Sequence, residues 1–109
     1  MRNPARMIIL SGILVIAGCN DKGKNFVGHW EDIKEPTTSY LEISFSDNFY
    51  HVDVHSIDRF LDMKPKVVRL EAQAMSDSVL TIRTGFGTVD MRLADDKIYF
   101  EQHTYQKPK

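Results

Sequence analysis

Residues 40–55 read YLEISFSDNFYHVDVH. Apolar side chains occupy every second position on both sides of Asp47-Asn48: Leu41, Ile43 and Phe45 before it, then Tyr50, Val52 and Val54 after it. Alternation with a period of two is typical of a strand with one buried face. Asp47 and Asn48 suit a two-residue turn because both side chains tolerate positive φ. The stretch therefore predicts an antiparallel hairpin.

The register of this hairpin follows from the turn. A two-residue turn places apolar residues opposite one another in three pairs: Phe45 with Tyr50, Ile43 with Val52, and Leu41 with Val54. A slip of one residue would break all three matches. The turn and the apolar pattern therefore predict the same pairing.

Further alternation along the chain predicts more hairpins of the same kind. Chain reversals are expected at Ser76-Asp77-Ser78, at Gly85-Phe86-Gly87 and at Asp95-Asp96. With a first strand near residues 27–33, about seven strands are joined by short turns. The sequence therefore predicts an all-β fold, a small antiparallel meander that forms a barrel or a sandwich.

One segment, residues 56–64, departs from this alternation. Its apolar residues Ile57, Phe60 and Leu61 have helical spacing, Ser56 suits the N-cap position, and Pro65 would end a helix. We therefore expect one short helical turn between two strands.

The N-terminus has the three-part layout of a secretory signal. Residues 1–6 carry two arginines and no acid, residues 7–16 are almost wholly apolar, and small residues follow. This apolar run is shorter than the about 20 residues that a membrane-spanning helix needs, and polar residues from Asn20 onward end it. A buried helix of a soluble domain is the alternative interpretation.

Ile16-Ala17-Gly18-Cys19 resembles the lipobox of bacterial lipoproteins, in which an aliphatic residue and two small residues precede a cysteine. The resemblance implies cleavage after Gly18 and attachment of a diacylglycerol to the sulfur of Cys19, whose new amino group is then usually acylated. Several acyl chains, at about 0.8 kcal/mol per buried methylene, anchor a protein firmly. In the enterobacterial sorting rule, aspartate after the cysteine retains a lipoprotein in the inner membrane. Asn20 stands at this position, which implies the outer membrane, facing the periplasm.

The lipobox resemblance implies a division of the chain into four parts. Residues 1–18 form the signal peptide that is removed, and residues 19–25 comprise the lipidated cysteine and a flexible polar tether. A single β domain follows over residues 26–105, and residues 106–109 form a tail.

The composition limits the classes of partner. Without residues 1–18 the chain has 91 residues, enough for one small domain, and 15 acidic residues outnumber 12 basic ones. No basic stripe interleaved with aromatic residues is present, so we expect no binding of nucleic acid. Cys19 is the only cysteine, which excludes an internal disulfide.

Gly28-His29-Trp30 resembles the G-x-W element that opens the first strand of lipocalins and small lipocalin-like bacterial domains. The resemblance implies that Trp30 closes one end of a barrel and that Gly28 lets the backbone pass close to it. Two interpretations of Trp30 stay open: a core residue at the barrel end, or a residue that lines a ligand pocket.

His51, Asp53 and His55 alternate along one predicted strand and therefore share one face, where His and Asp can converge on a tetrahedral metal. The register places Glu42 directly opposite Asp53, a like-charge pair that is destabilising unless a cation lies nearby. These four residues form a candidate zinc or calcium site. A neighbouring Lys or protonated His, or a solvated polar face, would also explain them.

Catalytic motifs are lacking. The sequence has no G-x-S-x-G elbow, no H-E-x-x-H and no glycine-rich phosphate loop. A lipidated Cys19 would be a thioether and could not act as a nucleophile. We therefore expect no enzyme and no cofactor.

Four aromatic residues, Phe49, Phe86, Tyr99 and Tyr105, lie at turns or on outward positions, where they either form an apolar contact patch or are partly buried against neighbouring strands.

The sequence thus predicts a non-enzymatic, lipid-anchored envelope protein whose periplasmic β domain binds a small apolar ligand or an envelope protein. The alternative is a periplasmic immunity or inhibitor lipoprotein that neutralises a toxin or a lytic enzyme, with His29, His51 or His55 entering the active site of the target. An enclosed apolar cavity would favour ligand binding, and a solid core with an exposed patch would favour the inhibitor.

Overall fold

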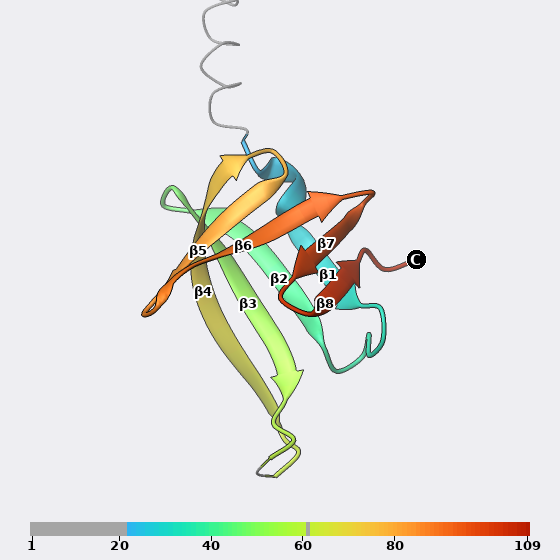
Figure 1. Ribbon diagram of the computed structural model, residues 1–109. Helices are drawn as coiled ribbons and strands as arrows, with labels where there is room; N and C mark the ends of the chain where they lie inside the picture. The colour runs from blue at the N-terminus through green and yellow to red at the C-terminus, as the bar shows by residue number, and fades with distance from the viewer. Residues whose placement is uncertain (1–21, 61) are drawn as a thin grey trace, which may run out of the picture.

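The computed structural model describes residues 22–60 and 62–109, which form a closed barrel of antiparallel strands (Figure 1). A short 3-10 helix, η1, precedes the barrel. The elements in chain order are η1 Lys24–Phe26, β1 Gly28–Asp32, β2 Tyr40–Ser46, β3 Phe49–Ile57, β4 Pro65–Ser76, β5 Val79–Thr84, β6 Gly87–Ala94, β7 Lys97–Phe100 and β8 His103–Gln106. The predicted all-β meander is confirmed, and it is a barrel.

The hairpin of residues 40–55 has the predicted register. Phe45 pairs with Tyr50, and the two pairs beyond them are Ile43 with Val52 and Leu41 with Val54. Asp47 and Asn48 have φ values of 54° and 70°, which is the left-handed conformation that both positions of this turn require. Asp95 and Asp96 adopt the same conformation between β6 and β7, with φ values of 55° and 62°.

Eight strands form the barrel, one more than the sequence analysis expected. The additional strand β8 pairs with β7 and also with β1, and its two pairs with β1 close the barrel: Glu31 with Gln106 and Asp32 with Tyr105. Gln106, expected at the start of the tail, is therefore the last residue of a strand.

The predicted helical turn over residues 56–64 is wrong. Ser56 and Ile57 continue β3 and pair with Lys66 and Pro65 of β4. The loop beyond them is closed by backbone hydrogen bonds between Asp58 and Lys64, and the part of it that the structure describes contains no helix. A helix this short is marginal in water and needs a surface that buries its apolar face. Phe60 is 98% exposed, so none of the described residues provides such a surface for it.

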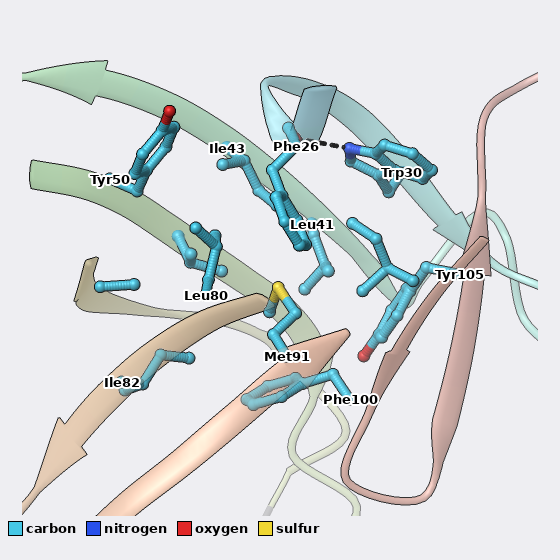
Figure 2. Packing of buried hydrophobic residues seen from close by; sticks show 13 residues of the cluster. Phe26, Trp30, Leu41, Ile43, Tyr50, Leu80, Ile82, Met91, Phe100 and Tyr105 are labelled. Carbon is cyan, nitrogen blue, oxygen red and sulfur yellow. Dashed lines mark hydrogen bonds between the residues drawn. The ribbon is translucent and has the colours of Figure 1, made fainter. Parts of the chain in front are cut away.

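The interior of the barrel is filled by side chains from every strand (Figure 2). The thirteen buried apolar residues are Phe26, Trp30, Leu41, Ile43, Tyr50, Val52, Ala72, Leu80, Ile82, Met91, Ile98, Phe100 and Tyr105. Inward positions of a small eight-stranded barrel leave just enough room for side chains. These side chains form one contiguous hydrophobic core.

The segment before β1, expected to be a flexible tether, contacts the barrel from Lys22 onward. The Tyr50 hydroxyl donates a hydrogen bond of 2.6 Å to the Lys22 carbonyl, and the Gly23 amide donates one of 3.3 Å to Asp77. Phe26, at the end of η1, is fully buried in the core. The domain thus begins before residue 26. The signal peptide, Gly18 and Cys19 lie outside the described residues.

Candidate functional site

Trp30 lies at one end of the barrel, with only 2% of its surface exposed. Its indole Nε1 donates a hydrogen bond of 2.8 Å to the carbonyl of Phe26, drawn as a dashed line in Figure 2. The Lys107 ammonium lies 4.8 Å from the centroid of the indole ring. Phe26, Trp30 and Lys107 thus close this end of the barrel, which places Trp30 in the core.

The edge of Trp30 borders a groove of about 720 Å³ on the outside of this barrel end. Apart from Trp30, Val27 and Leu93, its lining is polar: Lys24, Asn25, Asp95, Asp96, Lys97, Gln106 and Lys107. A pocket for an apolar ligand is mostly hydrophobic and enclosed. The groove therefore gives little support to the ligand-binding interpretation of Trp30.

The outer face of β1 to β4 carries a row of charged side chains, which is the principal candidate site. Successive strand pairs place His29 opposite Glu42, Glu42 opposite Asp53, and Asp53 opposite Arg69. Directly opposite residues of an antiparallel pair lie close enough for their side chains to interact. The row therefore has two acidic side chains in the middle and a basic one at each end.

His29 is the hydrogen-bond partner of the first acid of this row. Its ring Nδ1 donates to the Glu42 carboxylate at 2.6 Å, and its Nε2 lies 3.3 Å from the Glu31 carboxylate. The hydrogen bond to Glu42 is the main reason why the pKa of His29 is raised above its ordinary value, and partial burial of the ring opposes the shift. His29 is therefore held in its charged form over a wider pH range than a free histidine.

Arg69 neutralises the second acid. Its guanidinium donates two hydrogen bonds to Asp53, of 2.7 Å to one carboxylate oxygen and 2.9 Å to the other. This fork is the geometry in which arginine binds a carboxylate most strongly. The hydrogen bonds from Arg69 lower the pKa of Asp53 more than its partial burial raises it.

His51 and His55, the two histidines of the candidate metal site, contact other residues. The His55 ring stacks on Tyr40 of β2, with the ring centroids 4.3 Å apart and the planes 11° from parallel. His51 donates from Nε2 to the carbonyl of Ser46 at 3.2 Å, while its Nδ1 is buried and has no hydrogen-bond partner among the described residues.

The structure therefore brings Glu42 and Asp53 together as predicted but gives each its own cation from a flanking strand. Among residues 22–60 and 62–109, no group of three or more His, Cys, Asp or Glu side chains is arranged to hold a metal ion. Arg69 and His29 are the basic partners of the like-charge pair formed by Asp53 and Glu42. His51 and His55 contact β2, the strand that pairs with β3 on this side. The charges of this row are thus paired with one another within the sheet.

A second polar cluster lies where β1 meets β8, and the sequence analysis did not identify it. Asp32 is only 4% exposed, and its carboxylate accepts three hydrogen bonds: from the Lys34 amide at 2.8 Å, from His103 Nδ1 at 2.8 Å and from the Ser39 hydroxyl at 3.1 Å. Burial raises the pKa of Asp32, but these hydrogen bonds together outweigh it and lower the pKa below its ordinary value.

Neighbouring Tyr105 has its pKa raised to about 12, chiefly by burial. The signal that could have indicated this cluster is the position of Asp32, which falls on the inward side of β1, two residues after Trp30.

The chemistry of this cluster is structural. Ser39 and His103 both bind the Asp32 carboxylate, so the aspartate lies between them. A nucleophilic serine needs the histidine itself as its hydrogen-bond partner, because the imidazole must accept the hydroxyl proton. Asp32 instead holds the loop after β1 against the start of β8 and helps to close the barrel.

Large apolar side chains are exposed on the β3–β4 and β5–β6 hairpins. Phe60, near the end of the β3–β4 hairpin, is 98% exposed, and Phe86, at the β5–β6 turn, is fully exposed. Met63 and Val67 on the first of these hairpins are more than half exposed. Among the four aromatic residues that could have formed a patch, Tyr105 is buried in the core instead.

Comparison of the chain with protein-family models, with curated proteins and with solved structures gives no match. Within the residues that the structure describes, no helix has the length and apolar character to cross a membrane.

Proposed function

We propose that this protein is a lipoprotein of the bacterial envelope, anchored through Cys19, whose β barrel binds another envelope protein with its outer surface. The observation that carries the binding part of the proposal is the contrast between a filled interior and exposed apolar hairpins. Thirteen side chains fill the barrel, whereas Phe60 and Phe86 are exposed almost completely. Exposed aromatic side chains on a small domain are typical anchors of protein interfaces.

The anchor part of the proposal rests on the sequence from the basic N-terminus to Cys19. The proposed location is the outer membrane, with the barrel in the periplasm, because Asn20 follows the cysteine. Figure 1 adds a geometric argument: η1 and the loop between β3 and β4 lie at opposite ends of the barrel. A barrel held at its N-terminal end would therefore present the β3–β4 hairpin away from the membrane. No reaction is assigned to the protein.

The anchor is tested by replacing Cys19 in cells that carry the full chain. Wild-type protein should incorporate labelled palmitate and sediment with outer-membrane markers on a density gradient. The Cys19→Ser variant should accumulate as an uncleaved precursor without label. Normal maturation of this variant would refute the anchor, and sedimentation of the wild type with the inner membrane would refute the location.

The binding part is tested separately, by cross-linking in intact cells. A photoreactive residue in place of Phe60 should form a discrete adduct with one envelope protein. The matched control replaces Asn25, which is exposed in η1 at the opposite end of the barrel, and should form none. Equal labelling at both positions, together with a bound lipid or other small molecule in native mass spectrometry of the purified chain, would favour the small-ligand function instead.

The inhibitor function is the second candidate, and one observation favours it. The loop after β3 projects from the barrel and carries Phe60, with Arg59 beside it. A projecting loop of this kind can enter the cleft of a toxin or a lytic enzyme. If the adduct at Phe60 contains such an enzyme, addition of the purified chain should abolish its activity, and Phe60→Ser should restore it.

A further inference from the structure

Strand β4 has a free edge over half of its length. β4 pairs with β3 from Pro65 to Ala72, but its pairs with β5 begin only at Ala72. In the part of the chain that the structure describes, residues 65–71 therefore have a strand on one side only. Figure 1 shows the cause: the β5–β6 hairpin diverges from β4, and β4 continues with β3 beyond the barrel wall.

An unpaired edge of this kind is a template for another strand. Every second residue of residues 65–71 directs its backbone amide and carbonyl to the free side, where an extended segment can pair with them. Side chains next to the edge are apolar as well: Val67 is 54% exposed and Val68 is 45% exposed. A segment that paired here would gain backbone hydrogen bonds and cover both valines.

The charge along this edge is opposite in sign to that of the remaining domain. Residues 64–71 contain three basic side chains, Lys64, Lys66 and Arg69, against the single acid Glu71. The other described residues contain 13 acidic and 9 basic side chains. Lys64 and Lys66 take part in no ion pair with any described residue. Arg69 is held by Asp53 of β3, so Lys64 and Lys66 carry the positive charge that favours an acidic strand at this edge.

A second copy of this chain fits the edge poorly. A two-fold pairing of β4 about Val68 places Lys66 opposite Leu70 and Val67 opposite Arg69, which gives no pair of opposite charges. A pairing about Arg69 places two arginines opposite each other, which is destabilising. A pairing centred between Val67 and Val68 places Lys66 opposite Arg69, and this repulsion offsets the attraction of Lys64 to Glu71. Lysine and proline on an edge are also devices that prevent indiscriminate pairing. The basic residues of this edge, which oppose pairing with a second copy, attract a strand that carries acidic side chains.

We infer that residues 65–71 of β4 bind an extended acidic segment of a protein partner by antiparallel strand addition. The inference rests on the proposed function, since it names the surface and the chemistry through which the barrel binds protein. Acidic side chains of the added strand lie opposite Lys66 and Arg69, and apolar ones lie beside Val67 and Val68.

The probe is a labelled peptide, T-K-V-E-V-V-E-T, whose two glutamates fall opposite Lys66 and Arg69 when it pairs antiparallel with β4. Its control has the charges exchanged, T-E-V-K-V-V-K-T. Binding to the full chain in neutral detergent is measured by fluorescence anisotropy at low salt. We expect the acidic peptide to bind about tenfold more tightly, because three attractive cross-strand pairs replace three repulsive ones, the third being between Glu71 and the second residue of the peptide. Equal affinity for the two peptides, or no binding of the acidic one, would overturn the inference.

Two variants of the chain separate edge binding from general charge attraction. Lys66→Glu reverses the charge at the edge and should weaken the acidic peptide about tenfold, whereas Lys109→Glu makes the same change in net charge in the C-terminal segment and should have no effect. Equal weakening by both variants would overturn the inference. Amide signals of residues 65–71 should shift on titration of the peptide, and shifts confined to other strands would also overturn it.

The cross-linking experiment distinguishes this inference from the proposed function. If the adduct formed at Phe60 is lost in Lys66→Glu but kept in Lys109→Glu, strand addition at this edge is supported. If both variants keep the adduct, the barrel binds a protein partner elsewhere, and only the strand addition is refuted. A dimer of the chain that Lys66→Glu dissolves would likewise refute it, because the occupant would then be a second copy.

Discussion

Replacement of Phe26 by alanine should cost a large part of the stability of the domain. Phe26 is fully buried although it belongs to a three-residue helix that precedes the first strand. Truncation of a buried phenylalanine to alanine costs about 3–5 kcal/mol, because it removes apolar contacts and leaves a cavity. Domains of this size have a total stability of about 5–15 kcal/mol, so the loss is a substantial fraction. The Trp30 indole bonded to the Phe26 carbonyl would also lose its support.

The assay is urea unfolding of the full chain, followed by the fluorescence of Trp30, the only tryptophan. The matched control is Val27→Ala, since Val27 is the next residue and is 40% exposed. We expect the control to change the free energy of unfolding by less than about 1 kcal/mol, as partly exposed truncations do. If Phe26→Ala costs no more than the control, the segment before β1 does not belong to the folded domain, and the placement of η1 in the core is wrong.

Three further predictions concern titration and backbone strain. The folded-state pKa of Asp32 lies below its ordinary value of 3.8. The contribution of Asp32 to the free energy of unfolding is therefore present above pH 3.8 and is lost as the pH falls through the folded-state pKa. The variant Asp32→Asn should accordingly lose less stability between neutral and acid pH than the wild type. His29 has a raised folded-state pKa, so its contribution to the free energy of unfolding is complete below pH 6.5 and is lost as the pH rises through the folded-state pKa. A two-dimensional NMR titration should show a higher pKa for His29 in the wild type than in a Glu42→Gln variant. Gly23 has a φ of 85°, and a β-carbon there would lie 2.8 Å from that of Ala74; Gly23→Ala should therefore lower the melting temperature, and an unchanged value would contradict this close approach.

The hairpins were predictable from the sequence because their information is local. Alternation and turn residues lie within one short stretch, and a slip of one residue would turn every buried side chain outward. The pair formed by Phe45 and Tyr50 is an example, since the two-residue turn and the apolar alternation both predict that these residues lie opposite each other. The closure of the barrel is different, because β1 and β8 are joined by only two residue pairs from opposite ends of the domain. No local pattern specifies such a contact, so β8 and the Asp32 cluster beside it were missed.

The exposed apolar residues show a second limit of sequence patterns. Ile57 and Phe60 have helical spacing, but spacing indicates a helix only where a neighbouring surface can bury the apolar face. The β3–β4 hairpin extends beyond the barrel wall, where Phe60 has no such surface. Continued strand pairing of Ile57 with Pro65 is the alternative that the chain adopts. The exposure of Phe60 and Val67 on this hairpin is the observation from which both proposals are argued.

The helical turn expected over residues 56–64 also left the partner of Asp53 on the following strand unidentified. A helix between two strands leaves their register undefined, so the residue opposite Asp53 on the following strand could not be named. Once β3 is continued to Ile57 and paired with Pro65, each step back along β3 is a step forward along β4, and Arg69 falls opposite Asp53. The like-charge pair with Glu42 then has its cation within the sheet, at 2.7 Å, and needs no metal to account for it. The local structure of the loop between β3 and β4 thus determines which residue lies opposite Asp53, several residues away along the same strand.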